Sequence, residues 1–158
     1  AGYHALNSLR MEKAYRHWGH DISDEDSPIE AGLMFVVKMD KQDGFLGREA
    51  LLRQQEVGPR RTLVQFQLRD PDPLLFHNEP IWRNDKITGY VTSGMWSPAA
   101  KANIALAMIE TEYLDGEIWS EIYYEKELRQ YSKVAKCCIK QEPFWAPARA
   151  RATPAGDF

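Results

Sequence analysis

The spacing of apolar and polar positions changes character along the chain. In residues 3–12 apolar side chains recur at helical spacing, which predicts a short helix. A second helix is predicted over residues 45–55, with apolar residues on one face, and Gly58 and Pro59 end it. The first part of the chain is therefore predicted to contain two short helices.

The segment between these helices combines turn signals with a short apolar run. Gly19 interrupts the helical pattern, and residues 21–26 form an acidic, turn-rich stretch. Ser27 followed three positions later by Glu30 matches a capping box, so a brief helical turn is predicted there. Residues 33–39 are strand-like.

After Pro59 the pattern takes the period of β-strands. Residues 62–68 alternate strictly, with Val64, Phe66 and Leu68 predicted to point inward and Gln65, Gln67 and Arg69 outward. The strand that contains Thr92 and Ser93 is predicted to end at Gly94, where the backbone can turn sharply. The other predicted strands cover residues 79–83, 87–93, 103–109, 117–124 and 127–139, and the first and last pairs of these form hairpins.

These elements predict an α+β fold. A partial α/β segment, residues 1–58, precedes a six-stranded antiparallel, Greek-key-like β-barrel, residues 59–145. Residues 146–158 form a tail rich in Pro, Ala and Arg, which is predicted to dock over the surface or to stay loose. A small sandwich built from the same strands is the alternative.

Composition and charge narrow the function classes. The chain has 158 residues, 44% hydrophobic and 27% charged, as is ordinary for a soluble globular domain. Its net charge of −3 gives no argument for nucleic acid or an acidic membrane surface. No apolar run approaches the roughly 18 residues that a membrane-spanning helix needs. Neither nucleic acid nor membrane is therefore expected as a partner.

Residues 9–37 carry the densest mixture of functional groups. Ionisable side chains are interleaved there with Tyr15 and Trp18, and an apolar run follows them. Unpaired buried charge is costly, so a pure core segment would not have this composition. A surface that mixes rings and charges suits a planar, polar ligand. A charged, partly buried connecting segment is the alternative.

The sequence predicts no metal site. His17 and His20 are three apart and could share a helical face, but Gly19 lies between them and a third ligand is missing. Hydrogen bonding near a ligand is the other role considered for this pair. Cys137 and Cys138 are adjacent, which suits neither a disulfide nor a metal spacing and favours a reducing compartment. Nucleophile-elbow and phosphate-loop motifs are absent from the sequence.

Several motifs occur in an order that resembles a known family. They read LRMEKAYRHWGHDI, SPIEAGL, FVVK, FLGREALL, GYVTSGMWSP and NIALA. Between Gly2 and Phe144 the chain resembles the folate-binding aminomethyltransferases, which include the glycine cleavage T-protein and the C-terminal halves of dimethylglycine and sarcosine dehydrogenases and oxidases. The RHWGHD motif resembles the dehydrogenase and oxidase branch more than the free T-protein. Leu6 occupies the position where T-proteins carry a folate-contacting arginine.

The resemblance implies a function and a position in a larger protein. Residues 1–58 would be the C-terminal part of an incomplete folate-binding core, and residues 59–145 the C-terminal barrel. The larger protein that would contain this chain, called the parent below, would pass a one-carbon unit, derived from a methylated glycine, to tetrahydrofolate. FAD would lie in a separate upstream domain if the parent is dehydrogenase-like. A free T-protein fragment, or a non-catalytic barrel for docking or assembly, are the alternatives.

Because the family's catalytic aspartate and pterin-binding glutamate lie upstream of Ala1, no catalytic residue is expected in this chain, and the N-terminal part of the same protein is expected as a partner. The parent would be cytoplasmic in a bacterium or lie in the mitochondrial matrix of a eukaryote.

Four residues are predicted to contact the folate. Tyr15 matches a position where some relatives place an aromatic ring against it, although a core-edge tyrosine is the alternative. Glu12 is a candidate for ligand contact or for a structural pair with Arg10 or other neighbours. Arg149 and Arg151 in the tail are candidates for the glutamate carboxylates, which guanidinium groups bind in a bidentate manner.

Overall fold

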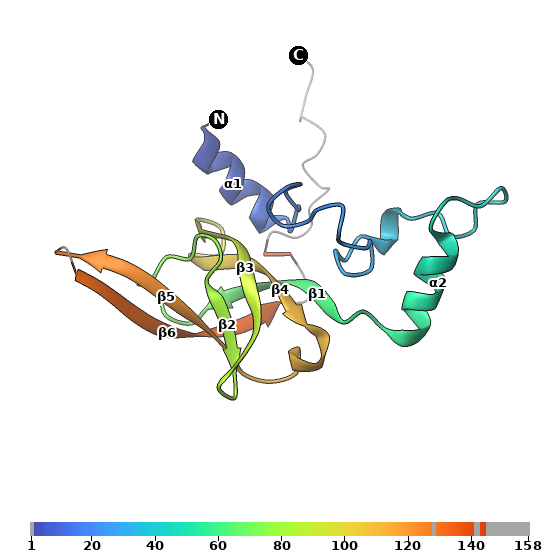
Figure 1. Cartoon of the computed structure of the whole chain (residues 1–158). Coiled ribbons are helices and arrows are strands. Elements are labelled where there is room, and N and C mark those ends of the chain that lie inside the picture. The colour runs from blue at the N-terminus through green and yellow to red at the C-terminus, as the bar shows by residue number, and fades with distance from the viewer. Residues whose placement is uncertain (1, 128, 141–142, 145–158) are drawn as a thin grey trace, which may run out of the picture.

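In the computed structural model, two α-helices precede six antiparallel strands that close into a barrel (Figure 1). The structure describes residues 2–127, 129–140 and 143–144. The elements are α1 (Tyr3–Glu12), the 3₁₀ turn η1 (Met34–Val36), α2 (Arg48–Val57), β1 (Arg61–Leu68), β2 (Pro80–Arg83), β3 (Lys86–Ser97), β4 (Ala102–Glu110), the 3₁₀ turn η2 (Thr111–Tyr113), β5 (Ile118–Lys126) and β6 (Arg129–Lys140).

The strand order confirms the predicted six-stranded antiparallel barrel. Around the barrel the strands follow β1-β4-β3-β2-β5-β6, and β6 pairs again with β1. β1 therefore lies beside β4 while β2, β3 and β4 are consecutive neighbours, which is the Greek-key relation. Helices give way to strands between Val57 and Arg61. The domain boundaries proposed from the sequence stay predictions, and the tail 146–158 lies outside the described residues.

The first hairpin has the turn chemistry that its sequence demands. Asn84 and Asp85 connect β2 to β3, with φ angles of 49° and 61°. Two consecutive left-handed residues make the turn type whose twist matches the flanking strands, and Asn and Asp tolerate that conformation. The predicted hairpin is confirmed. The β5–β6 hairpin extends beyond the barrel in Figure 1.

Two predictions for the first part of the chain need correction. Residues 33–39 are not a strand: they contain η1, and Phe35 and Val36 are 80% and 64% exposed. A strand needs a neighbour with free backbone groups, and the closed barrel leaves no edge for it to join. α2 begins at Arg48, three positions later than predicted, after Gly47 with φ 91°. The capping box is confirmed as the opening of a short turn, since Ser27 and Glu30 exchange hydrogen bonds of 2.9 and 3.2 Å.

β1 is buried on both faces rather than on one. Phe66 and Leu68 lie in the barrel core as predicted, but Leu63 and Gln65 on the opposite face are each only 7% exposed. The segment that follows α1 covers this outer face, and the Leu63 N–H donates to the carbonyl of Glu30 at 2.7 Å. The alternation correctly indicated a strand, but it did not indicate that a second layer covers the polar face.

Gly94 does not end its strand. β3 continues to Ser97, and the Gly94 N–H donates to the Phe76 carbonyl at 2.8 Å. A Cβ atom at position 94 would lie 2.4 Å from the backbone carbonyl of Leu75. The glycine is therefore required for the close approach of a second backbone, not for a turn.

A register shift in β3 positions the polar side chains of the candidate site. The pairing of β3 with β4 slips between Val91 and Ser93, so Thr92 is an additional residue in the strand. In a regular strand consecutive side chains point to opposite faces. At this bulge the side chains of Thr92 and Ser93 contact the same carboxylate.

Candidate functional site

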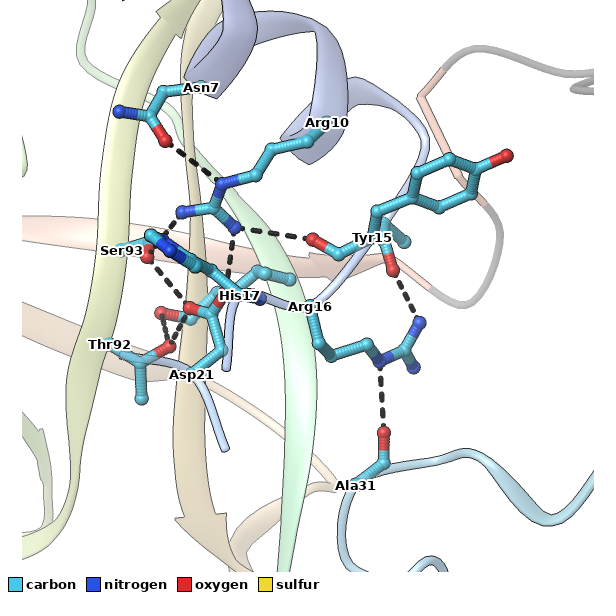
Figure 2. A network of polar contacts seen from close by, with 11 residues as sticks. Asn7, Arg10, Tyr15, Arg16, His17, Asp21, Ala31, Thr92 and Ser93 are labelled. Atoms are coloured by element: carbon cyan, nitrogen blue, oxygen red, sulfur yellow. Dashed lines mark hydrogen bonds and ion pairs between the residues drawn. The ribbon is translucent and has the colours of Figure 1, made fainter. Parts of the chain in front are cut away.

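The candidate site is built around the buried carboxylate of Asp21, whose side chain is 0% exposed. Arg10 Nη1 and the His17 N–H donate to Oδ2 at 2.6 and 2.7 Å. The hydroxyls of Thr92 and Ser93 each donate to Oδ1 at 2.7 Å (Figure 2). Four donors use the acceptor capacity of a carboxylate, so the buried charge is compensated. We call these five residues the Asp21 network.

Arg10 extends this network to α1 and to the chain after it. Its Nε donates to Asn7 Oδ1 at 3.0 Å, Nη1 to the Tyr15 carbonyl at 3.2 Å and Nη2 to Ser93 Oγ at 2.8 Å. The guanidinium therefore connects α1, the following loop and β3, which are far apart in the sequence (Figure 2).

The end of α1 explains how the chain turns back onto the barrel. The Tyr15 N–H donates to the Arg10 carbonyl and the Ala14 N–H to that of Met11, at 2.8 and 3.0 Å. Ala14 has φ 56° between them, so the helix ends in a Schellman motif with alanine at the left-handed position. This reversal directs the Tyr15 carbonyl toward Arg10 and returns the chain to Asp21.

Glu12 is a buried anchor of α1. It is 5% exposed, and its Oε1 accepts hydrogen bonds from Ser97 Oγ at 2.6 Å and from the Ala99 N–H at 3.0 Å. The structural pairing considered for Glu12 and Arg10 therefore runs to other neighbours: Glu12 to the end of β3, and Arg10 to Asp21. Ligand contact by Glu12 stays a prediction.

The aromatic candidates lie at the surface. Tyr15 is 56% exposed and its ring points away from the Asp21 network, while Trp18 is 66% exposed (Figure 2 for Tyr15). Neither ring is enclosed in the core, so both are accessible to a ligand or to a neighbouring segment. Arg149 and Arg151 lie outside the described residues.

Arg16 is a further candidate that sequence reasoning missed. Its Nε donates to the Ala31 carbonyl at 2.9 Å, and its Nη atoms donate to the carbonyls of Ala14 and Gly32. Within the described part of the chain no carboxylate lies within ion-pair distance of it. Burial lowers the pKa of Arg16 from its ordinary value, and the Asp21 charge opposes this shift. A half-buried arginine held by carbonyls is a signal that only three-dimensional structure provides.

Arg16 lies in the wall of a hollow of about 510 Å³, which we call the Arg16 hollow. A cation beside apolar walls suits a flat molecule that carries an anionic group. The hollow is lined by Ala14, Arg16, Gly32, Phe35, Thr62, Leu63, Val64, Gln65, Leu106, Leu114, Ile139, Lys140 and Pro143.

The described residues contain no group of three or more His, Cys, Asp or Glu side chains arranged to hold a metal ion. The rings of His17 and His20 are stacked, with centroids 4.7 Å apart. No helix in the part of the chain that the structure covers is long and apolar enough to cross a membrane.

Comparison with known proteins assigns both parts of the chain. The glycine cleavage T-protein C-terminal barrel domain matches residues 61–137, and the GCVT N-terminal domain matches residues 1–41. A closed barrel that matches the T-protein C-terminal barrel domain, preceded by a segment that matches the GCVT N-terminal domain, defines an aminomethyltransferase-type protein. The chain belongs to the glycine cleavage T-protein family, which confirms the resemblance found in the motifs.

Its relatives include an aminomethyltransferase, an oxidase and a dehydrogenase. A 4-methylaminobutanoate oxidase (formaldehyde-forming) of Paenarthrobacter nicotinovorans is 36% identical over 151 residues, 96% of this chain and 18% of the relative. An aminomethyltransferase of Listeria welshimeri is 38% identical over 148 residues, which are 94% of this chain and 39% of the relative. The mitochondrial sarcosine dehydrogenase of Homo sapiens is 46% identical over 109 residues, which are 69% of this chain and 12% of the relative. The chain therefore spans at most 39% of the length of these relatives.

A solved structure shows the same fold. The crystal structure of glycine cleavage system aminomethyltransferase T from Bartonella henselae matches with a TM-score of 0.76 and 24% identity, over 89% of this chain and 38% of that one.

Proposed function

We propose that this chain forms the C-terminal side of a tetrahydrofolate site in an enzyme that transfers a one-carbon unit to tetrahydrofolate. The observation that carries the proposal is the match of one chain to both domains of the glycine cleavage T-protein family. Members of that family bind tetrahydrofolate, and the relatives above include an aminomethyltransferase and a sarcosine dehydrogenase.

Within this proposal the residues of the chain bind and position rather than react. Tyr15 offers an exposed ring that can stack against a flat heterocycle, and the Asp21 network holds its backbone in place. Arg16 can face an anionic group from the Arg16 hollow. Glu12, Arg149 and Arg151 remain the other proposed contacts, and the reacting acids belong to the sequence that precedes this chain in the parent.

The parent is proposed to be dehydrogenase-like. The identity of 46% to a sarcosine dehydrogenase and the leucine at position 6 favour this branch, with a donor derived from a methylated glycine and FAD in a separate domain. Location follows the relatives: the cytoplasm for a bacterial parent or the mitochondrial matrix for a eukaryotic one. A free T-protein is the alternative identity for the parent enzyme. The reading frame upstream of Ala1 separates them, because only the dehydrogenase-like parent would encode a flavin-binding domain.

Reconstitution tests the folate site directly. Tetrahydrofolate is titrated against this chain, against the preceding segment of the parent, and against an equimolar mixture of the two. Binding by the mixture, much tighter than by either part, is expected if both parts form the site. A docking barrel without a folate role would leave the mixture no better than the preceding segment alone.

A further inference from the structure

All four histidines of the chain line one hollow. It has a volume of about 320 Å³ and lies between α1, the turn after it, the residues before β2, and β3. We call it the histidine hollow; its lining residues include His4, Asn7, Arg10, His17, His20 and His77. We propose that the histidine hollow binds a compact oxyanion, a phosphate or carboxylate group. The proposal is independent of folate binding.

The imidazole rings of His17, His20 and His77 lie in contact with one another, but their nitrogens have no hydrogen-bond partner among the described residues. The rings of His17 and His20 are stacked at 4.7 Å, and those of His20 and His77 meet edge-on at 5.8 Å. Among the described residues, no imidazole nitrogen makes a hydrogen bond and no carboxylate lies within 4.0 Å as an ion-pair partner. The hollow therefore presents hydrogen-bonding nitrogens that the protein itself does not satisfy.

Two carboxylates, Asp21 and Glu79, are bonded to residues of the hollow, and they differ in how far they are satisfied. Asp21 is paired with Arg10 and accepts hydrogen bonds from the hydroxyls of Thr92 and Ser93. Glu79 accepts the Phe76 N–H on one oxygen at 2.8 Å, and its other oxygen is buried without a hydrogen-bond partner among the described residues. Neither carboxylate forms an ion pair with an imidazole among the described residues, so the imidazole nitrogens remain available to an anion from outside the chain.

The rest of the lining favours an anion over a cation. Arg10 also lines the hollow, and one of its Nη2 hydrogens has no acceptor within the described part of the chain. The first turn of α1, which supplies His4, has no acidic residue, so its positive dipole end is not offset there. A metal ion is less suited, because the described residues do not arrange three ligands around one point.

Titration of inorganic phosphate tests the proposal. The four imidazole signals are followed by NMR in the 158-residue chain as phosphate is added. Saturable shifts of the His17, His20 and His77 signals are expected, because these residues line the hollow. Succinate in a second titration distinguishes the sources: tighter binding of phosphate assigns phosphoryl groups, and tighter binding of succinate assigns carboxylates.

Matched variants exclude general charge effects. His20→Gln and His77→Gln change exposed residues and are expected to keep the fold while each weakens phosphate binding about fivefold. Lys41→Gln removes a positive charge from an exposed loop outside the hollow and should bind phosphate as tightly as the unsubstituted chain does. Equal loss in Lys41→Gln, unshifted imidazole signals, or stoichiometric Zn²⁺ binding without phosphate binding would each overturn the proposal.

Discussion

At the scale of single residues, the chain places its charges in two different ways. Asp21 and Glu12 are buried and accept hydrogen bonds from side chains of β3, whereas Tyr15 and Trp18 are exposed. The carboxylates thus hold the first segment on the barrel, and the rings remain available. From the sequence the two groups could not be separated, because acids and aromatics alternate over residues 9–37 without a clear period.

Replacement of Asp21 should show how much this anchor contributes. Asp21→Asn leaves the half-buried Arg10 opposite a neutral amide, and the loss of one partner of a buried ion pair typically costs about 3–5 kcal/mol. Urea unfolding measures the change. The free energy of unfolding of Asp24→Asn, a change at an exposed position of the same loop, should stay within about 0.5 kcal/mol of that of the unsubstituted chain. A similar small change for Asp21→Asn would contradict the anchoring role.

The role of Tyr15 is best tested in the full-length parent. Tyr15→Ala should weaken tetrahydrofolate binding by about 1–3 kcal/mol, the contribution of an aromatic contact in a binding site. Because the ring is 56% exposed, the unfolding temperature should change little. Tyr15→Phe keeps the ring and should retain most of the affinity. Unchanged affinity in Tyr15→Ala would remove this residue from the site.

The two thiols should differ in reactivity. Burial raises the pKa of Cys137 to about 12 from 9.0, whereas Cys138 is half-buried. A thiol-reactive dye should label Cys138 in the native chain and Cys137 only after unfolding. Because the raised folded pKa favours the protonated thiol, the contribution of Cys137 to stability is present below pH 9 and is lost as pH rises toward 12. Rapid native labelling of both thiols would contradict this burial.

At the scale of elements, the strands were predicted from local pattern more accurately than their contacts. The hairpin turn at Asn84–Asp85 and the central strand β4 could be recognised because turn chemistry and two-sided burial are local properties. Residues 33–39 could not be assigned correctly from their own composition, since a strand also needs a partner. The close approach of Leu75 to Gly94 was likewise beyond a local pattern.

Gly94→Ala tests that close approach. The new Cβ would meet the Leu75 backbone at 2.4 Å, and overpacking of this kind costs about 3 kcal/mol when the backbone must move. Chemical denaturation measures the loss. Gly2→Ala, where no atom lies within 4 Å of the new Cβ, serves as control and should cost no more than about 1 kcal/mol. Equal stability of the two variants would mean that the neighbouring segment moves freely.

At the scale of the whole molecule, the barrel is closed but the first segment is not covered. α2 lies to one side of the barrel in Figure 1, and large apolar side chains are exposed along this segment. Leu46, Val57 and Phe35 are 102%, 88% and 80% exposed. Apolar surface of this kind is typical of a face that another segment covers. It supports the proposal that this chain packs against the preceding part of its parent.

The sequence by itself determined the strand periods, the capping box, the hairpin turn and the family motifs, because each depends on residues close together in the chain. Only the tertiary structure decided that Asp21 is a buried anchor, since its hydroxyl donors are 71 and 72 positions away. It also decided that the four histidines meet in one hollow. Contacts of this range depend on how the barrel closes and how the first segment folds back over it, and local pattern carries no information about either.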